Sequence, residues 1–246
     1  MYQFPCSRKI LVMYKMKNER IFLLFNASGS LGKAAVNYFL KTSFDYYYFF
    51  SRESIEIKSE KKNYEIIKVL ELTNDANVKS AFGNVKINTN ASYFLFNTIG
   101  GFYGGKTIAN TEYDEWLRMQ NINFNTSFLI AKHFARLAAD VWGGSICFTS
   151  ALSSLELETA KAAYNISKNS LNLLVKTLAL EGKDIGLSAN AVAPYIIDTP
   201  SNREWVKDIS KLINPDAICN VVNLLFENYR VMSGNIIELP GTLNEK

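Results

Sequence analysis

The chain has 246 residues, of which 48% are hydrophobic and 20% are charged, values typical of a folded globular protein and unlike those of disordered or collagen-like chains. Its 27 basic and 23 acidic residues are spread along the sequence without a basic stripe, which argues against nucleic acid as a partner. One histidine and three widely spaced cysteines argue against a metal site and a disulfide framework, so we expect no metal and a cytoplasmic, reducing environment.

The N-terminal residues 1–17 contain no recognisable element, and we expect a poorly ordered extension there. Met16 leads straight into the first apolar run, so it competes with Met1 as the natural start. Residues 18–246 are expected to form one domain, a usual size for an α/β protein. No apolar run approaches the ~20 residues of a membrane-spanning helix, so no membrane association is expected.

Seven short apolar runs are bounded by turn residues, at 21–26, 46–50, 65–70, 92–97, 145–149, 187–193 and 235–239. Because they are apolar nearly throughout, they predict strands that are covered on both faces, as in a parallel sheet. Helical patterns lie between them, at 31–41, 75–82, 112–139, 160–183 and 215–228. The alternation predicts an α/β fold with a Rossmann-type, doubly wound parallel sheet, in which ligands bind beyond the carboxyl ends of the strands.

The first predicted strand leads into residues 26–32 (NASGSLG) and then into a helix. In a phosphate-binding loop, Gly29 would let the backbone approach a pyrophosphate and Gly32 would let the helix pack closely on the strand. Asn26 stands where a first glycine is usual, and asparagine is the non-glycine residue that best tolerates a positive φ. The pattern indicates a dinucleotide-binding loop, with a plain strand-to-helix turn as the alternative.

The second predicted strand ends at Phe50 and is followed by Ser51 and Arg52, which would accept the 2′-phosphate of NADP(H). An NAD(H) site usually has a carboxylate here, and Glu53 would supply one if the register shifted by one residue. NADP(H) is therefore favoured over NAD(H).

Tyr164 and Lys168 are four residues apart in a helical pattern, so they project from one face of the helix. Tyrosine titrates near pH ~10 and needs a nearby cation to exchange protons at neutral pH. Lys168 and an oxidised nicotinamide ring would both provide that charge. The alternative is a surface pair on an ordinary helix.

These motifs, together with residues 97–105 (NTIGGFYGG) and 198–203 (DTPSNR), resemble the short-chain dehydrogenase/reductase family over residues 18 to about 241. The chain is most similar to the dihydropteridine reductase branch. The resemblance implies that Tyr164 donates a proton in reduction, that Lys168 lowers its pKa and holds the ribose, and that Asn123 holds a water in the proton relay.

The resemblance also implies which other residues bind the cofactor. Residues 97–100 would line its adenine-ribose side, and Ile197 and Thr199 would hold the nicotinamide carboxamide. With Tyr164 and Lys168, the full predicted set is Asn26, Ser28, Gly29, Ser30, Leu31, Gly32, Ser51, Arg52, Glu71, Leu72, Asn97, Thr98, Ile99, Gly100, Pro194, Tyr195, Ile197 and Thr199.

The sequence departs from the family pattern at Ala151, where the family usually has a catalytic serine and the dihydropteridine reductase branch does not. Ser150 is predicted to replace that hydroxyl, with Ser153 as the alternative. Phe102, Tyr103 and Ala151 are predicted to contact the substrate, although Phe102 and Tyr103 could also cap the core. Phe102 stands where the branch tends to have tryptophan, and Ser51 with Arg52 replaces its acidic NADH signature.

The sequence therefore predicts an NAD(P)H-dependent reductase that passes hydride to a small planar quinonoid or carbonyl substrate. One alternative is a general carbonyl or hydroxyl short-chain dehydrogenase. Another, suggested by Asn26 and Ala151, is a non-catalytic NADP(H)-binding regulator. The resemblance also implies a homodimer or homotetramer built on the helices at 112–139 and 160–183.

Overall fold

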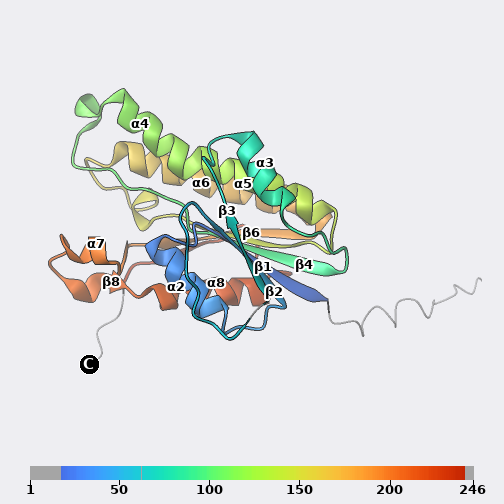
Figure 1. Cartoon of the computed structure of the whole chain (residues 1–246). Coiled ribbons are helices and arrows are strands. Elements are labelled where there is room, and N and C mark those ends of the chain that lie inside the picture. The colour runs from blue at the N-terminus through green and yellow to red at the C-terminus, as the bar shows by residue number, and fades with distance from the viewer. Residues whose placement is uncertain (1–17, 62, 242–246) are drawn as a thin grey trace, which may run out of the picture.

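The computed structural model describes residues 18–61 and 63–241 (Figure 1). The extension expected at residues 1–17, with both candidate start residues, lies outside the described residues, as do residues 242–246. The two ends of the expected single domain therefore stay predictions.

A seven-stranded sheet forms the middle layer, with the strand order β3-β2-β1-β4-β5-β6-β9. Every neighbouring pair in it is parallel. The strands are β1 (Glu19–Phe25), β2 (Tyr46–Ser51), β3 (Tyr64–Lys68), β4 (Ala91–Asn97), β5 (Gly144–Thr149), β6 (Leu187–Pro194) and β9 (Ile236–Leu239). The prediction of a doubly wound parallel sheet is confirmed, and each of the seven predicted strands is present.

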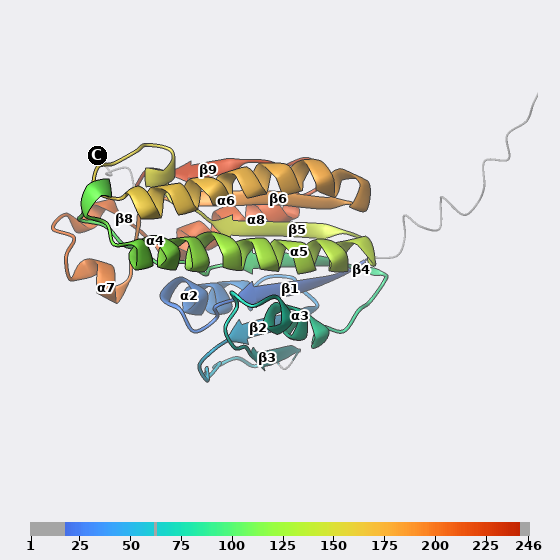
Figure 2. The ribbon, with the colours of Figure 1, turned by 90° about the horizontal axis from the view of Figure 1, so that it is seen from above.

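Helices cover both faces of this sheet (Figures 1 and 2). One face carries α3 (Asp75–Gly83), α4 (Tyr113–Met119), α5 (Thr126–Ala139) and α6 (Ala162–Glu181), and the other carries α2 (Ser30–Phe39) and α8 (Pro215–Glu227). The helix expected over 112–139 is interrupted by a π-helical turn, η2 (Gln120–Asn125). The helix expected from 160 begins at Ala162, because residues 155–161 form a loop.

Several short elements were not predicted from the sequence, since they are too short to show a period. The 3₁₀ turns are η1 (Ile108–Asn110), η3 (Leu152–Ser154), η4 (Gly182–Ile185) and η5 (Ile209–Lys211). The helix α7 (Pro200–Arg203) and the two-stranded sheet of β7 (Ile196–Ile197) and β8 (Leu212–Ile213) lie beyond the carboxyl ends of the large sheet (Figure 2).

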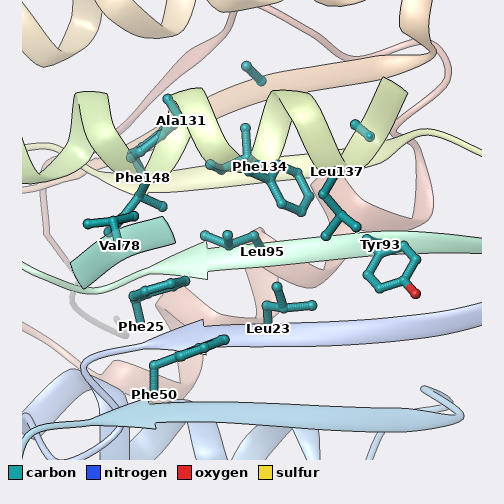
Figure 3. Close-up of a cluster of buried hydrophobic side chains, with 14 of the residues drawn as sticks. Leu23, Phe25, Phe50, Val78, Tyr93, Leu95, Ala131, Phe134, Leu137 and Phe148 are labelled. Atoms are coloured by element: carbon teal, nitrogen blue, oxygen red, sulfur yellow. The ribbon is translucent and has the colours of Figure 1, made fainter. Parts of the chain in front are cut away.

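Aromatic side chains fill the cores on the two faces of the sheet. Toward α3 and α5, Phe25 and Phe50 stack with ring centroids 4.2 Å apart, and Phe134 packs above Leu95 (Figure 3). Toward α2 and α8, Phe22 stacks on Phe39 at 4.3 Å. This burial on both faces explains why the strands are apolar throughout, and it makes the sheet a rigid support for the residues at its carboxyl edge.

The strand order reverses direction between β1 and β4, which are hydrogen-bonded neighbours. In doubly wound sheets the loops diverge at such a point and leave a crevice for ligands. The segments that leave β1 and β4 here are the two predicted cofactor loops, at 26–32 and 97–105. Within the described residues, no helix has the length and apolarity that crossing a membrane requires.

Candidate active site

Two cavities lie at the carboxyl edge of the sheet, with volumes of about 510 and 480 Å³. Ile99 and Gly100, which follow β4, line both of them. We call the first the β2-side cavity, because Arg52 at the end of β2 lines it. We call the second the α6-side cavity, because Tyr164 and Lys168 of α6 line it. Together they form the crevice expected at the point where the strand order reverses.

The β2-side cavity gathers predicted residues that follow four strands, β1, β2, β3 and β4. Besides Ile99 and Gly100, these are Asn26, Arg52, Glu71 and Leu72. The Ser51 hydroxyl is buried and donates to the Glu53 carbonyl oxygen at 2.7 Å, so its proton is already engaged. Arg52 is exposed and lines the cavity, whereas Glu53 is absent from the described residues that line it.

The turn after β1 is shaped by close backbone approach. Asn26 has φ +67°, the left-handed conformation expected there, and its side-chain amide donates to the Thr98 carbonyl oxygen at 3.3 Å. A Cβ atom on Gly32 would overlap the Asn26 carbonyl oxygen, and one on Gly29 would overlap the Asn26 side chain. Gly32 is therefore required by the packing of this turn, whereas a Cβ atom at Gly29 would require the Asn26 side chain to move. With the N-terminus of α2 beginning at Ser30, the turn can receive an anionic group.

Lys168 is buried at the base of the α6-side cavity, where its Nζ donates to the Thr149 carbonyl oxygen at 2.7 Å. A Cβ atom on Gly100 would lie 2.9 Å from this Nζ, so the glycine leaves room for the ammonium group. Burial lowers the pKa of Lys168 to about 7, because the charged form is poorly solvated there. This lysine can therefore change its charge near neutral pH.

Tyr164 lines the same cavity as Lys168, one helical turn earlier. Burial raises the pKa of its phenol above the ordinary value of 10.0. The lowered pKa expected from the sequence is therefore not produced by the protein's own side chains. The physical reason is that the cost of burying a phenolate exceeds the influence of a lysine that is itself easily neutralised.

Asn123 is buried on the π-helical turn and links two elements of the crevice. Its Oδ1 accepts from the Gly101 amide at 2.9 Å, and its Nδ2 donates to the Gly101 carbonyl oxygen at 3.0 Å and to the Ser167 Oγ at 3.0 Å. Its main-chain carbonyl oxygen accepts from Ser127 at 2.8 Å. Asn123 thus ties the glycine-rich loop after β4 to α6, a connection that the sequence did not predict.

The three residues considered for the missing family serine lie in different surroundings. Ser150 lines the α6-side cavity, but its hydroxyl donates to the Asn172 Oδ1 at 2.6 Å, so its proton is directed into the core. Ser153 is half-buried and lines the cavity. Ala151 is buried and lines neither cavity, because it begins the 3₁₀ turn η3.

Of the predicted substrate contacts, Phe102 lies in the α6-side cavity and meets the Tyr164 ring edge to face, with centroids 5.0 Å apart. Tyr103 lines neither cavity, because it packs beneath the Arg118 guanidinium at 5.9 Å. The sequence interpretation missed Glu158, Lys161 and Trp205, which all line the α6-side cavity. Only Lys161 carried a signal, since it stands three residues before Tyr164 at the start of a helix.

The remaining predicted cofactor residues divide into two groups. Leu31, Thr98, Pro194, Tyr195 and Ile197 line the α6-side cavity. Ser28, Gly29, Ser30, Gly32, Asn97 and Thr199 line neither cavity. Local bonds explain two of these, because Asn97 donates to Ser127 and Thr199 caps α7 by accepting from the Asn202 amide. Within residues 18–61 and 63–241, no cluster of three or more potential metal ligands is present.

Comparisons with known proteins place this arrangement among oxidoreductases. A protein-family model described as enoyl-(acyl carrier protein) reductase matches residues 47–220. Galactitol 2-dehydrogenase from Rhizobium johnstonii is 29% identical over 140 residues, which are 51% of this chain and 54% of that protein. Dehydrogenase/reductase SDR family member 6 from Danio rerio is 31% identical over 114 residues, which are 46% of each chain.

The chain spans about half the length of the curated relatives it matches. Among solved structures, ElxO with NADP bound superposes with a TM-score of 0.78 at 20% identity, covering 90% of this chain and 97% of that one. At this identity the superposition shows a shared fold.

Proposed function

The chain belongs to the short-chain dehydrogenase/reductase family, and on this premise we propose that it is an NADP(H)-dependent reductase of small molecules in which Tyr164 donates a proton. The observation that carries the proposal is the convergence of Tyr164 and the buried Lys168 on one cavity beside the carboxyl ends of β4 and β5. A buried, unpaired lysine is costly in a fold, and such groups cluster at sites where protons move.

The residues of the crevice fit a dinucleotide. The Asn26–Gly32 turn and the start of α2 would hold the pyrophosphate, and Lys168 would hold ribose hydroxyls. Arg52 would pair with the 2′-phosphate, and its position in the β2-side cavity, without Glu53, supports NADP(H) over NAD(H). When bound, the cofactor supplies the hydride and, once oxidised, a positive charge near the phenol.

Tyr164 keeps its proton at neutral pH, because burial raises its pKa. It is therefore in the form that a reduction needs, in which a proton must reach the substrate heteroatom as hydride reaches the adjacent atom. The ammonium of Lys168 favours the phenolate that remains after this transfer. Since the pKa of Lys168 lies at about 7, the lysine can then pass a proton to the phenol.

A planar quinonoid substrate, as in a dihydropteridine reductase, is favoured by the environment of residues 150–153. Ala151 offers no hydroxyl, and the Ser150 proton is engaged with Asn172, so polarisation of a ketone oxygen is weak. The alternative is a general carbonyl or hydroxyl substrate, supported by the galactitol dehydrogenase relative and by Ser153, which lines the cavity.

We also propose that the protein acts in the cytoplasm as a homodimer or homotetramer. Cys147 and Cys219 are buried and free, as suits a reducing compartment. Tyr113 on α4 and Leu173 on α6 are exposed, at 71% and 61%, on the helices that the sequence associates with self-association. Light scattering of the purified protein measures the subunit number directly.

The proposal is tested by NADPH oxidation with quinonoid dihydropterin, quinones and ketones as acceptors. Substituting Tyr164→Phe is expected to retain NADPH binding and to lower turnover by ~10²- to 10⁴-fold, the usual contribution of general acid catalysis. Tyr113→Phe is the matched control, because this tyrosine is exposed on α4 and lines neither cavity. Unchanged turnover in Tyr164→Phe would refute its role.

The same assay distinguishes the rival role of a non-catalytic NADP(H)-binding regulator. Such a protein would bind NADPH and oxidise it with none of the acceptors. The proposal predicts turnover with at least one acceptor, with a higher rate for quinonoid compounds than for ketones.

A further inference from the structure

An ion pair faces the cavity beside Tyr164. Lys161 Nζ lies 2.7 Å from Glu158 Oε2, and both side chains line the α6-side cavity. Glu158 is the only acidic residue among the described residues that line this cavity. Lys161 is the residue directly before α6 and stands three residues before Tyr164. Glu158 stands three residues before Lys161, in the loop that leads to α6.

This ion pair contributes little to the stability of the fold. The side chains of Lys161 and Glu158 keep exposed fractions of 27% and 43%, and ion pairs this exposed contribute only ~0–1 kcal/mol. Between the two residues, Ala160 has φ +59°, a left-handed conformation that is uncommon for alanine. A costly conformation of this kind persists where the surrounding structure enforces it, and often at ligand-binding sites.

The loop that carries the pair is fixed to the glycine-rich loop after β4. The Gly105 amide donates to the Ala160 carbonyl oxygen at 2.8 Å. Lys161 Nζ also lies 5.7 Å from the centroid of the Phe102 ring, which itself abuts Tyr164. A Cβ atom on Gly104 would come within 2.9 Å of the Phe102 ring, so this glycine lets the ring and Lys161 meet. The pair is thus held in place at the wall of the cavity.

Aromatic side chains form much of the remaining wall. Phe102, Tyr195 and Trp205 line the cavity with exposed fractions of 53%, 39% and 57%. Large apolar side chains exposed inside a cavity favour a ligand with flat apolar faces. Beside them, the Glu158 carboxylate accepts hydrogen bonds and the Lys161 ammonium donates them.

We infer that the Glu158–Lys161 pair is the substrate-recognition element of this cavity, and that it selects planar rings with a cis-amide edge. In such an edge an N–H donor, which suits Glu158, stands beside a C=O acceptor, which suits Lys161. This inference rests on the proposed function, since it names the substrate class of the same cavity. Both residues are positioning residues, because they bind an edge of the ring remote from the proton that Tyr164 donates.

Calorimetric binding tests the inference without any turnover. The probes are lumazine, a planar bicyclic ring with cis-amide edges, and its analogue with methyl groups on both amide nitrogens, titrated into the protein with NADP⁺ at a pH where the rings are neutral. A site that hydrogen-bonds an N–H group rejects analogues lacking it, so lumazine is expected to bind at least ~10-fold more tightly. Equal affinities would overturn the inference.

Two substitutions test the assigned residues. Glu158→Ala is expected to remove most of the preference for lumazine, because the N–H group then loses its acceptor. Lys161→Met, which keeps the stem that packs on Phe102, is expected to weaken the binding of both probes, because both present the C=O group. Glu156→Ala is the matched control, because Glu156 is exposed on the same loop and does not line this cavity. A preference that survives in the folded Glu158→Ala variant would show that the pair only fastens the loop, and would overturn the inference.

The test of this inference and the test of the proposed function can fail independently of each other. If the lumazine preference depends on the pair while no acceptor supports NADPH oxidation, the recognition element stands and the reductase assignment fails. If NADPH is oxidised and Tyr164→Phe abolishes it while the pair has no effect on binding, the reductase assignment stands and the recognition element fails.

Discussion

The two halves of the crevice are built from different parts of the chain. In the β2-side half, shape comes from the backbone, through the left-handed Asn26 and through Gly32, at which a Cβ atom would overlap the Asn26 carbonyl oxygen. In the α6-side half, shape and charge come from side chains that reach backbone groups of other segments, such as Lys168 with the Thr149 carbonyl oxygen and Asn123 with the Gly101 carbonyl oxygen. In the proposed function, the first half would hold the cofactor by close approach and the second would move protons.

This difference predicts opposite sensitivities. In the β2-side half, a substitution that adds an atom should lower stability and cofactor affinity, and a substitution that removes one should change them little. In the α6-side half, removal of a single functional group should lower activity. The substitutions below test this contrast.

The largest effect is expected at Lys168 in the α6-side half. Lys168→Met keeps an apolar stem of similar length and removes the ammonium that faces the Thr149 carbonyl oxygen. We expect kcat to fall by about 10³-fold, because Tyr164 loses both its proton source and the charge that favours its phenolate. Steady-state kinetics check this, with Lys176→Met as the control, since Lys176 is exposed on the same helix. A loss in both variants would contradict the comparison.

A smaller effect, on stability and cofactor affinity together, is expected at Gly32. Gly32→Ala places a methyl group against the Asn26 carbonyl oxygen, so the strand and α2 must separate. Overpacking of this kind costs about 1–3 kcal/mol of unfolding free energy. Urea unfolding and NADPH titration measure both changes. Gly83→Ala is the matched control, because its Cβ atom would meet nothing within 4 Å, and it should not destabilise the protein.

A change of intermediate size is expected at Asn26, where two substitutions separate the backbone conformation from the side chain. Asn26→Gly preserves the left-handed conformation and loses only the hydrogen bond to Thr98, so we expect a loss of stability of about 1 kcal/mol or less and nearly unchanged NADPH affinity. Asn26→Ala loses the same hydrogen bond and must also adopt the unfavourable φ, which together cost about 1–3 kcal/mol. If both variants were equally destabilised, the side chain rather than the backbone would shape this half of the crevice.

The smallest effect is a pH dependence of stability that arises from Lys168. Its pKa falls from 10.5 to about 7 on folding, so between these values the unfolded chain binds more protons than the fold. Stability contributed by this residue therefore rises with pH above about pH 7. The raised pKa of Tyr164 opposes the trend above about pH 10, because only the unfolded chain then loses the phenolic proton.

Urea unfolding of wild type and Lys168→Met, from neutral pH to about pH 9.5, isolates this contribution. The stability of wild type relative to the variant should increase over the range. A flat or falling difference would mean that Lys168 stays charged in the fold.

The sheet could be predicted from the sequence because its strands are buried on both faces and therefore read as continuous apolar runs, as at Phe22 and Phe94. The left-handed conformation at Asn26 was also predictable, because it is a local property of one residue. The π-helical turn around Asn123 was not, since its six residues lie directly between α4 and α5.

Side-chain partners were the least predictable part of the site. The engagement of Ser150 with Asn172 and the packing of Tyr103 under Arg118 depend on contacts between distant segments. The raised pKa of Tyr164 depends on burial, which a helical spacing does not report. Glu158 and Trp205 were missed because they lie outside regular elements and carry no period.

The central claim is that the crevice holds NADP(H) with the Tyr164 hydroxyl beside the nicotinamide. A crystal structure of the protein with NADP⁺ tests it most directly. We expect the 2′-phosphate to lie at the Arg52 guanidinium in the β2-side cavity and the nicotinamide to lie in the α6-side cavity, within hydrogen-bonding reach of Tyr164. A cofactor bound elsewhere, or a Tyr164 hydroxyl remote from the nicotinamide, would contradict it.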